Sequence, residues 1–246
     1  MTPCEPNPAV AFHDQLADRW EEKYAGASFS RRAQALLSLA GGVRPGEHWL
    51  DAGCGTGTLA RRLARQGCRV TAVDGSARMI ESARRARAVN GVAPPVTFLR
   101  VNDVVSLPFA DRSFDGVMCS SVLEYVDSPT RVLGELARVL RAGGTLLVSV
   151  PNRRALLRRT QKIAHWSTAR LGLAPWPKYL GLSRHEYTRQ QFVRLLATVP
   201  LEARAWRYYG PRLPAALADT RYGGTLLLFA CVRVDPRGAS AAVTNG

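Results

Sequence analysis

The chain has 246 residues, a length that suits one domain, or one domain with an insertion, and that allows a substantial hydrophobic core. Its 34 lysine and arginine residues exceed its 19 aspartate and glutamate residues and give a formal net charge of +15. No apolar stretch approaches membrane-spanning length, and residues 1–10 contain Glu5 and three prolines but no apolar core. We therefore expect neither a transmembrane helix nor a signal peptide.

Arginine supplies nearly all of the positive charge, because the chain has only three lysines. Such a charge favours an acidic partner, an anionic substrate or an anionic membrane surface, although a GC-rich genome would produce the same arginine bias. The cysteines are scattered and form no C-x-x-C pair, which predicts reduced thiols in a cytoplasmic protein.

The N-terminal part of the chain is predicted to be helical after a proline-rich start. Leu16, Trp20 and Tyr24 share one face of a first helix, and residues 31–39 predict a second helix that ends at Gly41-Gly42. One interpretation of the first helix is a packing element over one end of a sheet.

The stretch from Trp49 to Ala60 has the pattern of a strand, a glycine-rich turn and a helix start. The apolar run ends at Asp51, and three glycines follow at alternate positions: Gly53, Gly55 and Gly57. Glycines let the backbone take positive φ or approach a ligand closely, and the helix start offers free N–H groups. A dinucleotide-binding turn, G-x-G-x-x-G, would need a glycine where Thr58 stands.

Polar residues follow the next two predicted strands. Asp74 ends the second strand, where an acid can hold both hydroxyls of a ribose. Ser76 predicts the N-cap of a helix through residue 89 that turns Met79 inward. The third strand, residues 96–101, leads into Asn102-Asp103-Val104.

A proline turn at Leu107-Pro108-Phe109 precedes a fourth predicted strand over residues 117–120. Its end, Ser120-Ser121, lies where ligands bind in open α/β sheets. A helix that begins near Pro129 and a strand over residues 145–150 follow.

Residues 151–187 are the least regular part of the chain. Basic residues between 153 and 170 alternate with apolar ones such as Ile163 and Trp166, and the pattern permits two interpretations. One is a basic amphipathic helix that lies on an anionic membrane. The other, which we favour, is a solvated helix in an insertion that covers a substrate pocket.

The pattern of residues after 187 predicts a helix and the last two strands of a sheet. Thr188 and Gln191 have the spacing of a capping box before a further helix. Two closing strands, residues 201–209 and 225–234, are joined by a loop and followed by a mobile tail, residues 235–246. The alternation of strands and helices requires a doubly wound α/β sheet.

The glycine run between Asp51 and Asp74, with the later series Leu107-Pro108-Phe109 and Ser113-Phe114-Asp115, resembles the class I S-adenosylmethionine-dependent methyltransferases. The resemblance covers about residues 45–152 strongly and is of the small-molecule type found in ubiquinone and menaquinone biosynthesis. It implies a Rossmann-like, doubly wound, seven-stranded and mostly parallel sheet with an antiparallel last strand.

The resemblance also implies a division of the chain. Residues 45–234 would form the methyltransferase domain, with a substrate-covering insertion at about residues 152–187. Residues 1–44 would form a helical lid segment, which is the alternative to simple packing.

The implied cofactor is S-adenosyl-L-methionine, and the implied product is S-adenosyl-L-homocysteine. Carried over by position, Asp51 and the turn would hold the methionine moiety, Asp74 the ribose, and Asp103 with Val104 the adenine. The full set of expected cofactor residues is Tyr24, Asp51, Gly53, Cys54, Gly55, Gly57, Asp74, Gly75, Met79, Asn102, Asp103, Val104 and Ser120.

The chemistry would be attack by an acceptor atom on a sulfonium methyl group. The leaving group is neutral, so the main tasks are alignment and desolvation, and a base is needed only if the nucleophile keeps a proton. His185 is the first candidate base, and Tyr125 or Glu124 the second. The family commonly has Glu-His where this chain has Glu124-Tyr125, so we expect no metal site.

The sequence favours methyl transfer to O, N or C of a small molecule, in bacterial secondary metabolism or quinone-like biosynthesis. DNA is not an expected substrate, because the Asn-Pro-Pro-Tyr type of signature is absent after the fourth strand, where Ser120-Ser121 stands. We expect a cytoplasmic monomer or homodimer, with peripheral contact to the inner membrane face through residues 153–171 left open.

Two rival functions stay open. One is a non-catalytic module that binds an anionic membrane or RNA through the basic insertion. The other is a nicotinamide oxidoreductase, which the spacing at Gly57 and Thr58 disfavours.

Overall fold

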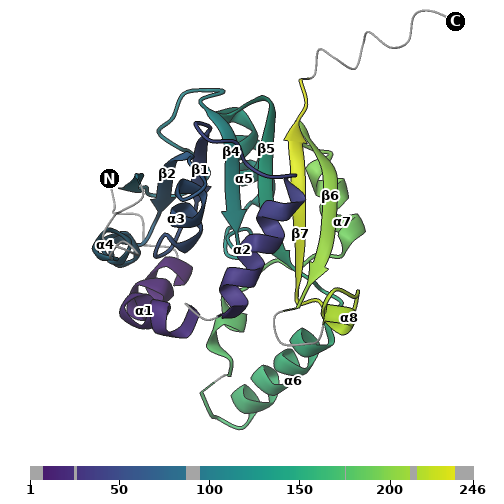
Figure 1. Cartoon of the computed structure of the whole chain (residues 1–246). Helices are drawn as coiled ribbons and strands as arrows, with labels where there is room; N and C mark the ends of the chain where they lie inside the picture. Colours follow the sequence, from purple (N-terminus) through teal and green to yellow (C-terminus); the bar gives the residue numbers. More distant parts are fainter. Residues whose placement is uncertain (1–7, 25–26, 87–94, 175, 211–214, 236–246) are drawn as a thin grey trace, which may run out of the picture.

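The structure is a computed structural model that describes residues 8–24, 27–86, 95–174, 176–210 and 215–235. A seven-stranded sheet in the order β3-β2-β1-β4-β5-β7-β6 forms its centre (Figure 1). β7 runs antiparallel to β5 and β6, whereas the other neighbouring strands are parallel, which confirms the predicted architecture. The strands are β1 (His48–Ala52), β2 (Arg69–Asp74), β3 (Val96–Arg100), β4 (Phe114–Ser120), β5 (Leu140–Pro151), β6 (Leu201–Tyr209) and β7 (Leu226–Arg233).

Helices cover both faces of the sheet. The helices are α1 (Pro8–Tyr24), α2 (Ala27–Leu39), α3 (Thr58–Ala64), α4 (Ala77–Arg85), α5 (Pro129–Val139), α6 (Leu156–Arg170), α7 (Arg189–Leu196) and α8 (Ala215–Ala218), with a 3₁₀ turn, η2, at Lys178–Gly181. α2 and α3 share one apolar core with the sheet, and α5 and α7 share the other. α4 packs on β2 and β3, and α1 packs on α4.

The two cores explain why the central strands β1, β4 and β5 bury side chains on both faces of the sheet. Adjacent residues of one strand point to opposite faces, so Trp49 lies in the core with α2 and α3, and Leu50 lies in the core with α5 and α7. Both are almost completely buried.

Local signals in the sequence set several helix starts as expected. The Ser76 hydroxyl caps α4 by accepting a hydrogen bond from the Met79 N–H at 3.0 Å. At α7, Thr188 and Gln191 form the predicted capping box. These caps satisfy N–H groups that have no partner within the helix.

Other boundaries differ from the sequence prediction. The strand predicted over residues 145–150 is longer in the structure, because β5 begins at Leu140 and includes Gly143 and Gly144. The register of β4 against β5 shifts between Phe114 and Gly116, so the chain passes this point as an irregularity of the ladder. The loop expected between β6 and β7 contains the short helix α8. The helix predicted to run through residue 89 ends earlier, at Arg85, because the backbone of Ala86 leaves the helical conformation.

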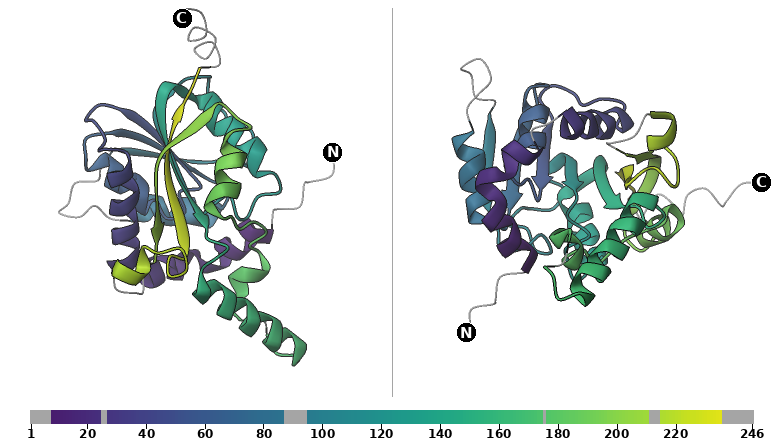
Figure 2. Two further views of the ribbon diagram at one scale, coloured as in Figure 1. Left: turned by 90° about the vertical axis from the view of Figure 1, so that its right-hand side faces the viewer. Right: turned by 90° about the horizontal axis from the view of Figure 1, so that it is seen from below.

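α6 stands out from the body of the molecule at the end of the sheet where β5 finishes (Figures 1 and 2). When the molecule is seen from below, α1 and α6 both lie on the side that faces the viewer (Figure 2, right). No helix in the described part of the chain is both long enough and apolar enough to cross a membrane.

Candidate functional site

The glycine-rich turn between β1 and α3 is held against the end of β2. The N–H groups of Gly53 and Cys54 both donate to the Val73 carbonyl oxygen, at 2.8 and 2.9 Å. Gly53 has a φ of 76°, and a Cβ atom there would lie 2.3 Å from Cγ2 of Val122. The turn therefore needs glycine at this position for its backbone angle and for its contact with the segment after β4.

Asp74 fixes the turn from the end of β2. Its Oδ2 accepts from the Gly55 N–H and its Oδ1 accepts from the Ser76 N–H, each at 2.8 Å. Burial raises the pKa of Asp74, and the two N–H donors oppose that rise. Each carboxylate oxygen keeps a second lone pair, so the oriented carboxylate can still accept hydroxyl donors.

Asp51 is a buried carboxylate below the turn. It is 1% exposed, and neither of its oxygens has a hydrogen-bond partner among the described residues. Burial, and secondly the nearby Asp74, raise the pKa of Asp51 to about 7. An unsatisfied buried acid is costly, so this position suits a cationic or hydrogen-donating ligand group.

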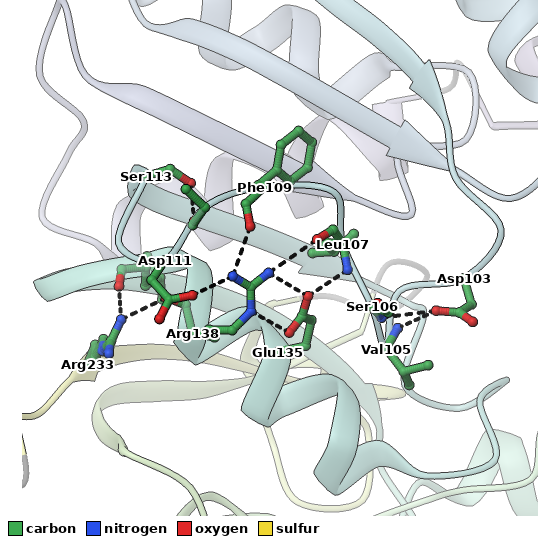
Figure 3. Close-up of polar contacts among 12 residues, drawn as sticks. Asp103, Val105, Ser106, Leu107, Phe109, Asp111, Ser113, Glu135, Arg138 and Arg233 are labelled. Carbon is green, nitrogen blue, oxygen red and sulfur yellow. Dashed lines mark hydrogen bonds and ion pairs between the residues drawn. The ribbon is translucent and has the colours of Figure 1, made fainter.

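The segment after β3 forms the next part of the wall. Oδ1 of Asp103 accepts from the N–H groups of Val105 and Ser106 at 2.9 and 3.0 Å, which closes a local turn (Figure 3). This turn places Asn102, Asp103 and Val104 together along one cavity.

Arg138 of α5 ties the following loop to the core. Its guanidinium makes two hydrogen bonds of 2.8 Å to the Glu135 carboxylate and also donates to the Leu107 and Phe109 carbonyl oxygens (Figure 3). Oε1 of Glu135 accepts from the Leu107 N–H at 2.6 Å. The network anchors the loop whose first residues, Asn102 to Val104, line the cavity.

The carboxyl end of β4 carries a strained serine. Ser121 has a φ of 58°, which is rare for a residue other than glycine. Its N–H donates to Oγ of Ser149 at 3.0 Å, and its own Oγ accepts from Nη1 of Arg32 at 3.1 Å. Such strain often accompanies a functional site, and both Ser121 and Arg32 line the cavity.

The cavity joins these parts at the carboxyl ends of β1, β2 and β4, and its volume is about 210 Å³. Expected residues in its wall are Gly53, Cys54, Gly55, Asp74, Gly75, Met79, Asn102, Asp103, Val104, Ser120 and Tyr125. Ser121, expected at the ligand-binding end of the fourth strand, also lines it, and residues that sequence reasoning did not assign to it are Ala9, Val10, His13, Trp20, Arg32, Leu59, Val122 and Val126.

α1 contributes His13 and Trp20 to the wall. Nδ1 of His13 donates to the Ala9 carbonyl oxygen at 2.6 Å, so a neutral ring carries its lone pair on Nε2. The His13 ring centroid lies 5.2 Å from the ring centroids of both Trp20 and Tyr125. Sequence reasoning noticed these aromatic residues, but nothing local marks which of them face a ligand.

Some expected residues lie away from the cavity wall. Gly57 caps α3, and a Cβ atom there would lie 2.4 Å from Cε1 of Phe98, so its smallness serves packing. Asp51 is buried behind the wall. Tyr24 ends α1, and its side chain lies outside what the structure describes.

His185, the first candidate base, is also absent from the wall. Its Nε2 donates to the Val126 carbonyl oxygen at 2.9 Å, and its ring stacks on Tyr187. Here His185 joins the chain before α7 to the segment after β4, so its expected role as a base has no geometric support.

Glu124 lies behind the wall rather than in it. It is 4% exposed, burial raises its pKa to about 7, and Oε2 has no hydrogen-bond partner in the described part of the chain. Of the three candidate bases, Tyr125 alone is in contact with the cavity.

The expected insertion does not contribute to this cavity. Within the ranges the structure covers, none of the lining residues comes from 152–187. A cover over the substrate therefore stays a prediction. The described residues also contain no group of three or more His, Cys, Asp or Glu side chains placed to hold a metal ion.

Comparison with known proteins agrees with the site. Residues 50–148 match a family described as a methyltransferase domain. A demethylmenaquinone methyltransferase of Renibacterium salmoninarum is 35% identical over 146 residues, which are 58% of this chain and 59% of the relative. A ubiquinone biosynthesis O-methyltransferase of Xylella fastidiosa is 32% identical over 161 residues, which are 65% and 58% of the two chains.

The chain thus spans only 59% and 58% of the lengths of these curated relatives. The solved structure of magnesium protoporphyrin IX methyltransferase from Synechocystis PCC 6803 with bound SAH has the same fold, with a TM-score of 0.67 and 20% identity over 92% of this chain and 99% of that one. Through its residues 50–148, the chain is similar to methyltransferase domains.

Proposed function

We propose that this chain transfers a methyl group from S-adenosyl-L-methionine to O, N or C of a small-molecule acceptor and releases S-adenosyl-L-homocysteine. The observation that carries the proposal is the single cavity wall that combines the glycine turn, Asp74 and the segment Asn102–Val104. When bound, the cofactor supplies an electrophilic methyl group on a positively charged sulfur.

The polar residues at the cavity fit that cofactor. Asp51 is an unsatisfied buried anion beneath the turn, and it would stabilise the positive charge of the methionine moiety. Asp74 would hold the ribose hydroxyls, and Asp103 with Val104 would hold the adenine. The apolar residues Leu59 and Met79 would exclude water from the reacting groups.

Proton removal, where the acceptor needs it, falls to the residues that reach the cavity. We assign it to His13, whose Nε2 is the free ring nitrogen of the neutral form, with Tyr125 beside it. Because His13 belongs to α1, the helical segment 1–44 would act as a lid that also brings the base.

A small apolar or aromatic acceptor suits the site better than a nucleic acid base. Trp20, Val122 and Val126 line the cavity beside the polar cofactor residues. The printed names of the two relatives point to quinone-like compounds, and secondary metabolites of similar shape would fit equally. We propose an enzyme of the cytoplasm, monomeric or homodimeric.

A transfer assay tests the proposal. The chain is incubated with methyl-labelled S-adenosylmethionine and a panel of catechols, hydroxyquinones and naphthoquinols, and the products are identified by mass spectrometry. Label in an acceptor together with released S-adenosylhomocysteine supports the proposal. No transfer to any acceptor and no binding of the cofactor would overturn it in favour of a non-catalytic module.

A further inference from the structure

α6 stands out from the body of the molecule (Figures 1 and 2). Large apolar side chains on this helix are exposed to solvent. Within α6 and the turn after it, side chains with more than half of their surface exposed are Leu156, Ile163, Trp166, Leu171, Leu173 and Trp176. Several large apolar side chains exposed on one short segment indicate an interaction site.

The inner face of α6 is fixed by polar contacts with the returning chain. Gln161 accepts from the Tyr179 hydroxyl at 2.9 Å, and the His165 ring lies 3.2 Å from the Pro177 carbonyl oxygen. Oγ1 of Thr168 accepts from the Trp176 N–H at 3.2 Å. These contacts set the rotation of the helix, so its opposite face is held outward.

That outward face mixes apolar and basic residues. Leu156, Ile163 and Trp166 follow helical spacing on one side, and Arg159 and Arg170 lie among them. The Arg170 guanidinium lies 5.3 Å from the centre of the Trp166 ring. Long arginine side chains can direct their charge to a lipid headgroup while their stems lie along apolar surface.

A basic cleft lies at the start of the same helix. It is lined by Arg153, Arg154, Arg158, Arg159, Lys162, Glu186 and Thr188. Glu186 pairs with Arg158 at 3.1 Å and with Lys162 at 2.5 Å. Among the residues that the structure describes, no acid pairs with Arg153, Arg154 or Arg159, so the cleft keeps an excess of positive charge.

We propose that α6 docks this protein on an anionic phospholipid membrane. The outward apolar side chains would enter the headgroup–acyl boundary, and the arginines of the helix and the cleft would bind lipid phosphates. A nucleic acid would use the charge and could stack a base on Trp166, but it would not use the exposed aliphatic side chains Ile163, Leu171 and Leu173. The combination of both features therefore favours an acidic lipid surface over RNA.

The position of α6 gives this docking a consequence for the site. α6 follows the carboxyl end of β5, and the cavity opens at the carboxyl ends of β1, β2 and β4, so both lie at the same edge of the parallel strands. This last step rests on the proposed function: an acceptor dissolved in the bilayer would reach the cavity from the docked side.

Vesicle flotation tests the docking without any assay of methyl transfer. The full chain is mixed with vesicles of pure phosphatidylcholine, or of equal parts phosphatidylcholine and phosphatidylglycerol. We expect flotation with the anionic vesicles alone, weakening as salt is added. We expect Ile163→Ser with Trp166→Ser, and separately Arg159→Gln with Arg170→Gln, to lower the bound fraction about tenfold.

Two matched controls make the result specific. Arg131→Gln with Arg194→Gln removes the same charge from exposed sites on α5 and α7, and Val193→Ser removes an exposed aliphatic side chain from α7. Circular dichroism checks that every variant folds.

Four results would each overturn the proposal. They are absence of flotation at low salt, equal binding to neutral vesicles, equal losses in the control variants, or displacement of the protein from anionic vesicles by a single-stranded RNA that binds it more tightly. Loss of methyl transfer alone would bear on the proposed function and not on docking.

Discussion

Asp51 shows that this site is maintained at a cost in stability. Its carboxyl group is buried without a hydrogen-bond partner among the described residues, and its pKa is raised from 3.8 to about 7. Between these two values the folded state binds a proton that the unfolded state has released. Stability therefore falls as pH rises across this range, and the penalty is complete above pH 7.

We predict that Asp51→Asn stabilises the ligand-free protein more at pH 8 than at pH 5, by at most about 4 kcal/mol at the higher pH. The same variant should lose S-adenosylmethionine affinity by at least about tenfold, because the buried negative charge is gone. Urea unfolding at both pH values and calorimetry measure the two effects. Asp127→Asn, at an exposed carboxylate, is the control.

His13 is the residue to test for proton transfer. We predict that His13→Ala lowers kcat by roughly a hundredfold for an acceptor that must lose a proton. Cofactor affinity should change little. His185→Ala is the matched comparison, because that ring donates to the Val126 carbonyl oxygen away from the cavity. Equal effects of the two substitutions on kcat would contradict the assignment.

Individual site residues were predictable where the signal is local. Asp74 and Asp103 follow strands whose ends meet at one edge, so their place was readable from the sequence. His13 and Arg32 were missed because α1 and α2 reach the cavity only through tertiary packing. The structural contact of His185 was missed for the same reason, since its partner is 59 positions away.

At the scale of elements, α1 is attached to α4 by two acids. Asp14 accepts hydrogen bonds from the Ser76 hydroxyl and, at 3.3 Å, from the Arg78 N–H. Asp18 pairs with Arg78 and lies 3.8 Å from Arg85. The negative charge of Asp14 also lies at the N-terminus of α4, which the helix dipole favours.

We predict that Asp14→Asn with Asp18→Asn loosens α1 without unfolding the sheet. Amide exchange within α1 should quicken while exchange in β4 and β5 stays slow, and cofactor affinity should fall about threefold to tenfold. Glu81→Gln is the control, because it removes an exposed acid of α4 that pairs within its own helix. Unchanged exchange in α1 would show that its apolar contacts alone hold it.

The Arg138 network links α5 to the loop that begins at the cavity residues Asn102 to Val104. We predict that Arg138→Met lowers the free energy of unfolding by about 1–3 kcal/mol at pH 7, because Glu135 loses its charged partner. Arg138 lowers the pKa of Glu135 below 4.5, so this stabilisation is complete above that value and is lost as pH falls through the folded pKa. The difference between variant and wild type should therefore shrink in acid. Urea unfolding measures it, with Arg131→Met as the control.

Helices were predicted correctly where a capping residue precedes apolar residues at helical spacing, as at Ser76 before α4, Thr188 before α7 and in the apolar face of α5. Prediction failed where the sheet decides the conformation. Gly143 and Gly144 look like a turn in isolation, yet the pairing of β5 with β4 and β7 draws them into the ladder. The short α8 has too few residues to produce a periodic signal.

At the scale of the whole molecule, the sheet and the cavity depend on one another. The parallel strands β1, β2 and β4 bring the glycine-rich turn, Asp74 and Ser120 to a common edge of the sheet, although these residues lie far apart in the sequence, between positions 53 and 120. The sequence predicts this fold class well because buried parallel strands alternate with amphipathic helices. It does not predict that no described residue of 152–187 lines the cavity, since the same basic and apolar pattern suits a pocket cover and a surface helix.

The most direct test of the account is calorimetric titration of the purified chain with S-adenosylmethionine, S-adenosylhomocysteine and NAD. The account predicts affinities on the order of micromolar for the two sulfur nucleotides, no binding of NAD, and loss of binding in a folded Asp74→Ala variant. Because Asp74 also holds the Gly55 N–H, Asp74→Asn is included to separate the charge from the hydrogen bond. Tight binding of NAD, or no binding of either sulfur nucleotide to the folded wild type, would contradict the account.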